Sequence, residues 1–460
     1  MSPEFEIEIT NWLTSGVGEP EVRETTAEIS IRVGPYCATE VEDRPARSVR
    51  RSVRASAYLL ASWFASNWWR LRWEPERTSP GAGSQTLDWD MGHKLGASGG
   101  GYVWPPLTFS SDGYHVLVHC EGREKELGES LSPIRYLNSF TTLIDVTSFE
   151  SGVSTFVEQV LARLDASQIR NSPLHALWTE VRTERAKKPL ESKRRLEALL
   201  GVDPDEEESL IEGLLRWQAK IGRQALGEIA AASGASDVEA ILNATSRAAE
   251  SVREFARIAE YGRIKSELAD KGSLSGEVPW VLGKEVAATV RRVWGLEDKP
   301  VTNLDLAERL SVGEAIFSGA YANIPVAVGV RGSGEEQLKL LLRPMQPARQ
   351  RFDLARLIGD HIGVDAGDAW KPATRSMTAR QKFQRAFAAE FLCPSDMLYA
   401  RYQHGFEVDE DVDEAVLDIS REYQVSERLV LNHLVNRGLI GGSSWGDSDV
   451  YDAGRMFEHP

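Results

Sequence analysis

The sequence contains little cysteine: its 460 residues include only Cys37, Cys120 and Cys393, with no Cys-x-x-Cys spacing. An odd number of isolated thiols argues against a disulfide framework and fits reduced cysteines in the cytoplasm. The sequence also lacks any apolar run near the roughly 20 residues that a membrane-spanning helix needs. Its first ten residues carry acidic side chains where a secretory signal would carry basic ones. We therefore expect a cytoplasmic protein without a membrane segment.

Positive charge is in deficit, with 53 Lys and Arg against 69 Asp and Glu and a formal net charge of −16. This balance argues against a protein that coats nucleic acid, because that role needs a basic surface to release counterions. Apolar residues make up 42% of the chain and include 13 tryptophans, which is enough to fill real cores. The length predicts two to four domains of roughly 100 to 200 residues each.

The periodicity predicts a multidomain α+β protein. The predicted parts are a mixed α+β domain of unknown role at 1–147, a helical region at 148–272, a third domain at 273–441 and a tail at 442–460. The Gly- and Ser-rich segment 271–276 marks the boundary before the third domain. The tail has little periodicity, so it is either a flexible end or a segment that docks on the body or on a partner.

The first domain is predicted to contain strands at 5–9 and 27–33, because apolar and polar residues alternate there. Apolar spacings of three and four predict one long helix over 45–72. The segment 99–120 is predicted to be a β-hairpin, because Asp112-Gly113 is a favoured turn dipeptide between two apolar runs.

Residues 351–394 carry the pattern around which the rest of the chain is organised. They predict two helices separated by a polar connection, and the second helix ends at Pro394, which has no N–H to continue it. Small residues in the second helix would let another backbone approach closely. The residues expected in the core are Phe352, Leu354, Ala355, Phe387, Ala388 and Leu392.

This stretch resembles the ImmA/IrrE family of metallopeptidase-like domains. The frame of the family matches at Arg351, Phe352, Leu354, Ala355, Gly359, Phe387, Ala388, Ala389, Glu390, Leu392 and Pro394. The resemblance extends over about 275–440, with helices expected at 279–310, strands at 324–330 and 338–342, and closing helices at 411–440. It implies a zincin-like fold, and active members of the family cleave transcriptional repressors in mobile elements, stress responses and anti-phage defence.

The metal-binding positions of the family are changed in this chain. The family has a histidine, a glutamate and a second histidine where this sequence has Arg356, Leu357 and Asp360, and its third ligand position holds Gln381. A His-Glu-x-x-His helix works because two imidazoles at i and i+4 share a face and the glutamate acts as general base. Arg356 would repel a cation and Leu357 cannot take a proton. The resemblance therefore implies a pseudo-metallopeptidase without metal or cofactor.

A protein that keeps this frame without its ligands is expected to be a sensor, scaffold or regulatory subunit that binds a protein partner. The candidate binding residues are Arg356, Asp360 and His361, on the floor of a groove beside an exposed strand edge that could pair with an extended segment. An isolated buried arginine is costly, so Arg356 should meet a carboxylate from a partner or from the tail, such as Asp447, Asp449 or Asp452.

Two alternatives come from other functional classes. The first is an active peptidase with a rebuilt site made of Asp353, Asp360, His361 and Glu390. The second is a DNA-binding regulator, because 411–440 carries a helix-turn-helix-like pattern. In that case the groove-facing residues would be Glu427, Arg428, Asn432 and His433. An acidic run directly before these helices would repel phosphates, so their packing within the domain is favoured.

Two further clusters in the first domain are candidate sites. Arg47, Arg50, Arg51 and Arg54, followed by four tryptophans, form a candidate phosphate or nucleic-acid contact, although pairing with Glu40, Glu42 and Asp43 is favoured. His93, His115, His119 and Cys120 suggest a metal site. However, i and i+4 residues of a strand lie about 13 Å apart, too far to share one ion. Nucleic acid is thus a possible but disfavoured partner, and the oligomeric state stays open.

Overall fold

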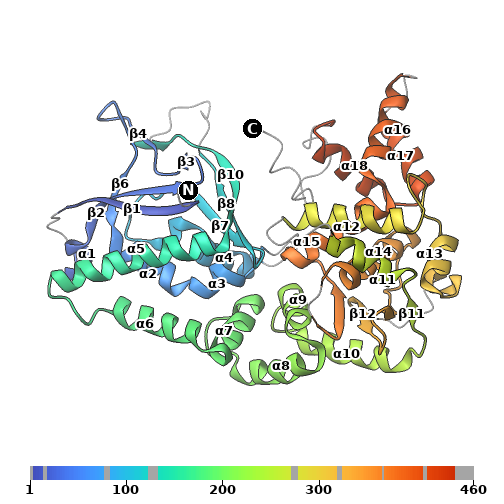
Figure 1. Ribbon diagram of the computed structural model, residues 1–460. Coiled ribbons are helices and arrows are strands. Elements are labelled where there is room, and N and C mark those ends of the chain that lie inside the picture. Colours follow the sequence, from blue (N-terminus) through green and yellow to red (C-terminus); the bar gives the residue numbers. More distant parts are fainter. Residues whose placement is uncertain are drawn as a thin grey trace. The chain divides into compact units, whose positions relative to one another are not determined.

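The computed structural model describes residues 4–13, 18–76, 83–122, 133–270, 278–318, 324–364, 367–407 and 412–440. Helices and antiparallel sheets both occur, so the expected α+β class is confirmed (Figure 1). The chain forms two compact units, Met1–Ile211 and Glu212–Pro460, called unit 1 and unit 2 below. Among the described helices, none combines the length and the apolar character needed to cross a bilayer. The predicted tail and the joint at 271–276 lie outside the described residues.

The predicted helical region 148–272 does not form a body of its own. Its first helices supply side chains such as Val153 and Trp178 to the core of unit 1. Its last segments supply Ala256 and Ile264 to the core of unit 2. Helical periodicity locates these helices along the chain, but it does not say against which core each apolar face packs.

Unit 1 contains three small antiparallel sheets and a layer of helices. Its elements are β1 (Phe5–Trp12), α1 (Pro20–Glu24), β2 (Thr26–Val33), β3 (Tyr36–Cys37), β4 (Val41–Asp43), β5 (Ser48–Arg50), β6 (Val53–Ser56), α2 (Ala57–Ser66), α3 (Trp68–Trp73), α4 (Gly83–His93), a 3-10 turn (Leu95–Ser98), β7 (Leu107–Ser111), β8 (His115–Cys120), β9 (Ile134–Tyr136), β10 (Phe140–Asp145), α5 (Val146–Ala166), α6 (Pro173–Ala186) and α7 (Lys188–Leu200). Helix α8 (Glu208–Ile221) crosses the boundary between the units.

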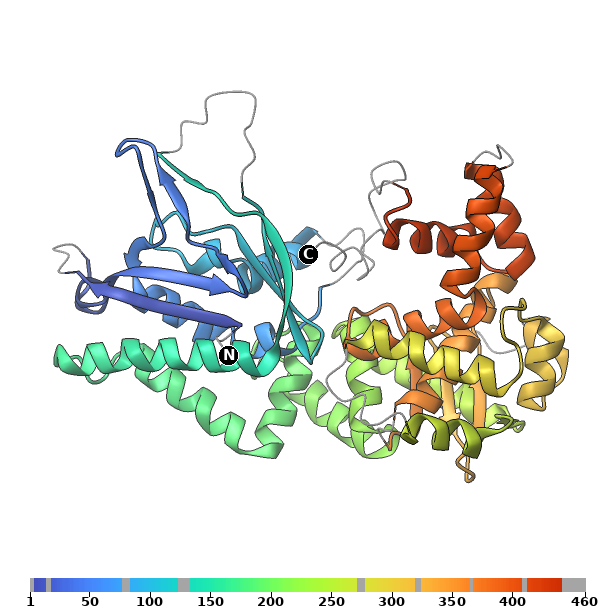
Figure 2. The same cartoon turned by 45° about the horizontal axis from the view of Figure 1, so that its top comes forward.

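The two predicted strands pair as β1 and β2, with Ile7 opposite Ile31. Both side chains are buried, as the alternation predicts, and α5 runs along this sheet (Figure 2). The predicted hairpin is also confirmed, since β7 and β8 pair across the Asp112-Gly113 turn.

The helix predicted over 45–72 is wrong in its first half. Residues up to Ser56 form β5 and β6, and only α2 and α3 are helical. Val53 pairs with Ile29 and Ala55 with Ala27 of β2, so both side chains enter the core from a strand. The four-residue spacing that suggested a helix competes with this alternation, and pairing with a distant strand decides between them.

The described residues of unit 2 form a four-stranded antiparallel sheet with helices packed against it. Its further elements are α9 (Arg223–Ser233), α10 (Val238–Ser251), β11 (Ala256–Arg257), α11 (Tyr261–Asp270), α12 (Pro279–Val293), α13 (Asn303–Leu310), a 3-10 turn (Glu314–Ser318), β12 (Ala327–Arg331), β13 (Gln337–Leu341), α14 (Pro347–Gly363), β14 (Trp370–Ala373), α15 (Ala379–Leu392), α16 (Ser395–Glu407), α17 (Val412–Tyr423) and α18 (Glu427–Asn436). The strand order is β11-β13-β12-β14.

The two central predicted helices are α14 and α15, and the connection between them contains β14, which was not predicted. Five of the six residues expected in the core are buried, whereas Phe352 is only partly buried. Glycines bring the helices together. A Cβ on Gly359 would lie 2.4 Å from the Phe387 ring, and one on Gly283 of α12 would lie 2.7 Å from the Phe383 carbonyl oxygen of α15. The predicted close approach of another backbone to α15 is therefore confirmed.

Candidate functional site

The residues at the family's ligand positions come together between α14, α15 and β14. The Arg356 guanidinium donates to the Gln381 side-chain oxygen and, at 2.6 Å, to the Thr374 carbonyl. Asp353 lies one helical turn before Arg356, with 3.5 Å between the charged groups. Burial lowers the pKa of Arg356 to about 10, so this guanidinium stays charged at neutral pH. A positive charge therefore fills the place at which the resemblance would put a metal ligand.

Asp360 is engaged by a second arginine that the sequence reasoning did not single out. Arg380 binds both carboxylate oxygens of Asp360, at 2.8 and 2.6 Å, and donates to Asp368 at 2.8 Å. Asp360 has no exposed surface. Burial by itself would raise the pKa of Asp360, but the adjacent Arg380 outweighs it and holds that pKa below its ordinary value. Asp360 thus serves as the counter-ion of an arginine.

Helix α9 closes the cluster from another side. Glu228 accepts hydrogen bonds from Thr378 at 2.6 Å and Ser376 at 3.3 Å, and the Ala225 amide donates to Asp368 at 3.1 Å. Burial raises the pKa of Glu228. Sequence reasoning missed Glu228 because it lies about 150 positions before its partners, and no local pattern links them.

The predicted exposed strand edge is not found at β14. The Gln381 side chain donates to the Pro372 carbonyl at 3.0 Å and accepts from the Thr374 amide at 2.8 Å, as a peptide group of a neighbouring strand would. Gln384 also donates to the Pro372 carbonyl, and Pro372 has no N–H to offer. Side chains of α14 and α15 therefore bind the outward-facing backbone groups of Pro372 and Thr374. The expectation that a partner could pair with the main chain at this edge is wrong for β14.

The candidate partner-binding residues are not surface residues. Arg356, Asp360 and His361 are 5%, 0% and 5% exposed. His361 Nε2 lies 2.7 Å from the Glu335 carbonyl oxygen, which can only accept, so Nε2 carries the proton. Arg356 is buried, as the hypothesis of a charge-paired arginine requires, and the groups that it contacts, Asp353, Thr374 and Gln381, all belong to unit 2. The tail carboxylates proposed to meet it lie outside the described residues.

His361 makes the stability of unit 2 depend on pH. Burial lowers its pKa to about 4 from 6.5, so the folded protein holds a neutral imidazole while the unfolded chain takes up a proton below pH 6.5. Stability is therefore lost as the pH falls from about 6.5 to about 4 and is fully present above that window. We expect His361→Gln to remove about 2 to 3 kcal/mol of the stability difference between pH 7.5 and pH 4.5. Urea denaturation of both proteins at the two pH values measures this; equal pH dependence would contradict it.

The rebuilt peptidase site is not supported by the geometry. Asp353 pairs with Arg343 at 2.7 Å, and Glu390 accepts from the Ser395 amide at the start of α16. Asp360 and His361 have the separate partners described above. In the part of the chain that the structure describes, no three His, Cys, Asp or Glu side chains are grouped closely enough to hold a metal ion.

The candidate nucleic-acid contacts are also largely occupied. Arg50 pairs with Asp43 at 2.8 Å and Arg51 with Glu40 at 3.4 Å, as the favoured interpretation predicts for these two arginines. Arg54 instead pairs with Glu28 at 2.9 Å. Arg47 lies in the turn between β4 and β5 and is exposed. In the helix-turn-helix-like segment, Glu427 and Arg428 are exposed and Asn432 is partly buried. His433 is buried on the inner face of α18, where it cannot face a DNA groove.

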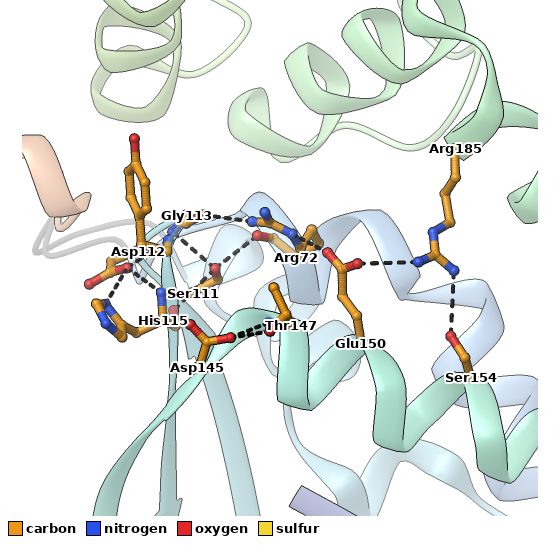
Figure 3. A network of polar contacts seen from close by, with 11 residues as sticks. Arg72, Ser111, Asp112, Gly113, His115, Asp145, Thr147, Glu150, Ser154 and Arg185 are labelled. Carbon is orange, nitrogen blue, oxygen red and sulfur yellow. Dashed lines mark hydrogen bonds and ion pairs between the residues drawn. The ribbon is translucent and has the colours of Figure 1, made fainter. Parts of the chain in front are cut away.

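The histidines of unit 1 do not form a metal site. His93 is buried between the Phe109 carbonyl and Glu74, at 2.8 and 3.1 Å, and His119 contacts Thr141 on β10. His115 follows the β7–β8 turn, where the Asp112 carboxylate accepts the His115 amide at 2.8 Å. Figure 3 shows that Arg72 ties this turn to α5, through the Gly113 carbonyl and Glu150. These contacts support the prediction of structural histidines.

Comparison of the chain with protein-family models, with curated proteins and with solved structures finds no match. The geometry of the site is therefore the basis for the functional argument that follows.

Proposed function

We propose that unit 2 is a degenerate ImmA/IrrE-like, zincin-like domain and that the protein acts without catalysis, as a sensor, scaffold or regulatory subunit that binds a protein partner. The observation that carries the proposal is the contact between Arg356 and Gln381, the residues at the first and third ligand positions. The side chains at the former ligand positions hydrogen-bond or pair with one another and with neighbouring residues, so they serve the core of the domain.

The electrostatics of the cluster support the absence of metal chemistry. A divalent cation at this place would lie beside the guanidinium of Arg356 and near that of Arg380, and both are buried where charge repulsion is weakly screened. The carboxylates that could offset such a cation, Asp360 and Asp368, already neutralise Arg380. Because active members of the resembled family cleave repressors in anti-phage defence, mobile elements and stress responses, we place the proposed regulatory role in the same settings.

Elemental analysis tests the proposal directly. We expect the purified full chain to contain far less than one zinc ion per molecule and to show no peptidase activity, because the ligands and the general base are missing. One zinc ion per chain that is lost in both Asp360→Ala and Gln381→Ala would contradict the proposal.

A restored variant tests the frame itself. Arg356→His, Leu357→Glu, Asp360→His and Gln381→Glu together rebuild the family's ligands and base, and Arg380→Gln removes the arginine that would otherwise lose a counter-ion. If this variant folds, as judged by hydrogen exchange in α14 and α15, the zincin-like frame predicts a gain of one zinc ion per chain. The same protein with Gln381 retained is the control, expected to bind zinc more weakly. A folded restored variant without zinc would contradict the frame.

A further inference from the structure

The opposite edge of the unit 2 sheet is open over a short stretch that ends before Ala259, whose N–H donates to the Arg309 carbonyl of α13 and whose C=O accepts from the Trp294 indole. Strand β11 pairs with β13 through residues on either side of Arg257: Ala256 is opposite Leu338, and the Ile258 amide donates to Glu336 at 3.0 Å. In an antiparallel pair, bonded positions alternate with outward-facing ones, so the N–H and C=O of Arg257 point away from β13. Phe255 directly precedes β11, and we expect the same direction for its backbone groups when the alternation is extended by one step. Within the described residues, none of these four groups has a hydrogen-bond partner.

The side chains at every second position of this edge are basic and aromatic, and the exposed Glu254 lies between the first two of them. Arg253, Phe255 and Arg257 alternate with buried or opposite-facing positions, and all three are exposed, with 38% of Phe255 accessible. Lys339 of β13 lies 5.2 Å from the centre of the Phe255 ring. In the described part of the chain, neither Arg253 nor Arg257 has a carboxylate at ion-pair distance. An apolar ring between two unpaired guanidiniums is thus presented beside an open strand edge.

We propose that β11 together with the three residues before it, residues 253–257 and called the β11 edge below, is a docking site for an extended acidic segment of a partner protein, which adds a strand to the sheet. Main-chain pairing with Phe255 and Arg257 supplies the register, and the alternating side chains supply the specificity. The segment that fits best carries an apolar residue opposite Phe255 and acidic residues two positions to either side, opposite Arg253 and Arg257.

Charge excludes the simplest competing occupant, a second copy of the same edge. Antiparallel self-pairing centred on Phe255 would place Arg253 directly opposite Arg257 twice, and like charges in opposed positions destabilise a strand pair. The other edge of the sheet is closed by Gln381 and Gln384, as described above. The β11 edge is therefore the place where this sheet can accept a strand, and open edges of this kind are normally blocked in natural proteins.

The test measures binding of a fluorescently labelled peptide, acetyl-Thr-Asp-Thr-Val-Thr-Asp-Thr-amide, to the full chain. The increase in fluorescence anisotropy of the peptide at low ionic strength gives the dissociation constant. We expect this peptide to bind about tenfold more tightly than the same peptide with Lys in place of Asp, and addition of salt should reduce the difference. Arg257→Ala removes one charge and should weaken binding a few-fold. Arg257→Pro also removes the outward N–H while leaving the bonds of Ala256 and Ile258 to β13, and should abolish binding.

Controls make each outcome decisive. Hydrogen exchange in β12 and β13 verifies that the Arg257→Pro protein is folded, and Arg421→Ala, at an exposed arginine of α17, should leave binding unchanged. Equal binding of the acidic and basic peptides, or unchanged binding to Arg257→Pro, would overturn the proposal. Binding that appears only after deletion of 441–460 would assign the edge to the chain's own tail and overturn it as well. This inference rests on the proposed function only in requiring a protein partner. The two can fail separately, because zinc analysis tests for a catalytic metal and peptide binding tests for docking at the β11 edge.

Discussion

Replacing Phe387 by alanine is expected to lower the free energy of unfolding of unit 2 by about 3 to 5 kcal/mol, the usual cost of emptying a large aromatic site in a core. Phe387 is completely buried and stacks on Phe391, with 5.5 Å between the ring centres. Its ring also fills the space left by Gly359 on α14. The cavity would therefore open at the contact of α14 with α15 and loosen the whole polar cluster between them.

Hydrogen exchange of the α14 and α15 amides under increasing urea is the suitable measurement, because a chain of two units need not unfold in one step. The matched control is Phe255→Ala, at a ring that is 38% exposed, which should cost clearly less. If Phe387→Ala were as stable as the parent protein, the packing of these helices described above would be incorrect.

Replacing Arg380 by methionine is expected to destabilise unit 2 by a similar amount, about 3 to 5 kcal/mol, because it leaves the buried carboxylate of Asp360 without its ion-pair partner. Methionine retains much of the side-chain volume, so the loss reports charge more than packing. If the unpaired charge of Asp360 causes the loss of stability, neutralising that charge should reverse part of it. Protonation of Asp360 should restore part of the stability as the pH falls, in contrast to the loss on acidification that His361 produces.

A triple variant separates charge from the hydrogen-bond network. Arg380→Met combined with Asp360→Asn and Asp368→Asn removes all three charges of the Arg380–Asp360–Asp368 group together and should recover much of the lost stability, as measured by urea denaturation at pH 7.5. An equally unstable triple variant would show that the geometry of the hydrogen bonds, rather than the buried charge, accounts for the effect. A stable single variant would show that Asp360 is not confined to a low-dielectric interior.

Local sequence patterns were sufficient for features that depend on neighbouring residues. Alternation identified β1 and β2, a turn dipeptide identified the β7–β8 hairpin, and helical spacing with Pro394 identified α14 and α15. The residues at the family's ligand positions could also be named from the sequence, together with the reason why Arg356 and Leu357 cannot do metal chemistry. These inferences need only the periods of helices and strands and the chemistry of single side chains.

The tertiary structure decided everything that depends on distant partners. Residues 53–56, whose spacing predicts a helix, form the strand β6 because they pair with β2. The connection after α14 contains the strand β14 because it pairs with the edge of β12. The sequence proposed Arg356, Asp360 and His361 as partner-binding residues on a groove floor, but in the fold these side chains are out of reach of a partner, since Gln381, Arg380 and the Glu335 carbonyl contact them from other segments. The sequence by itself thus identified the residues that the resemblance puts at metal-ligand positions. Only the fold decided that they pair with one another, because a buried charge is tolerated where a partner from elsewhere in the chain compensates it.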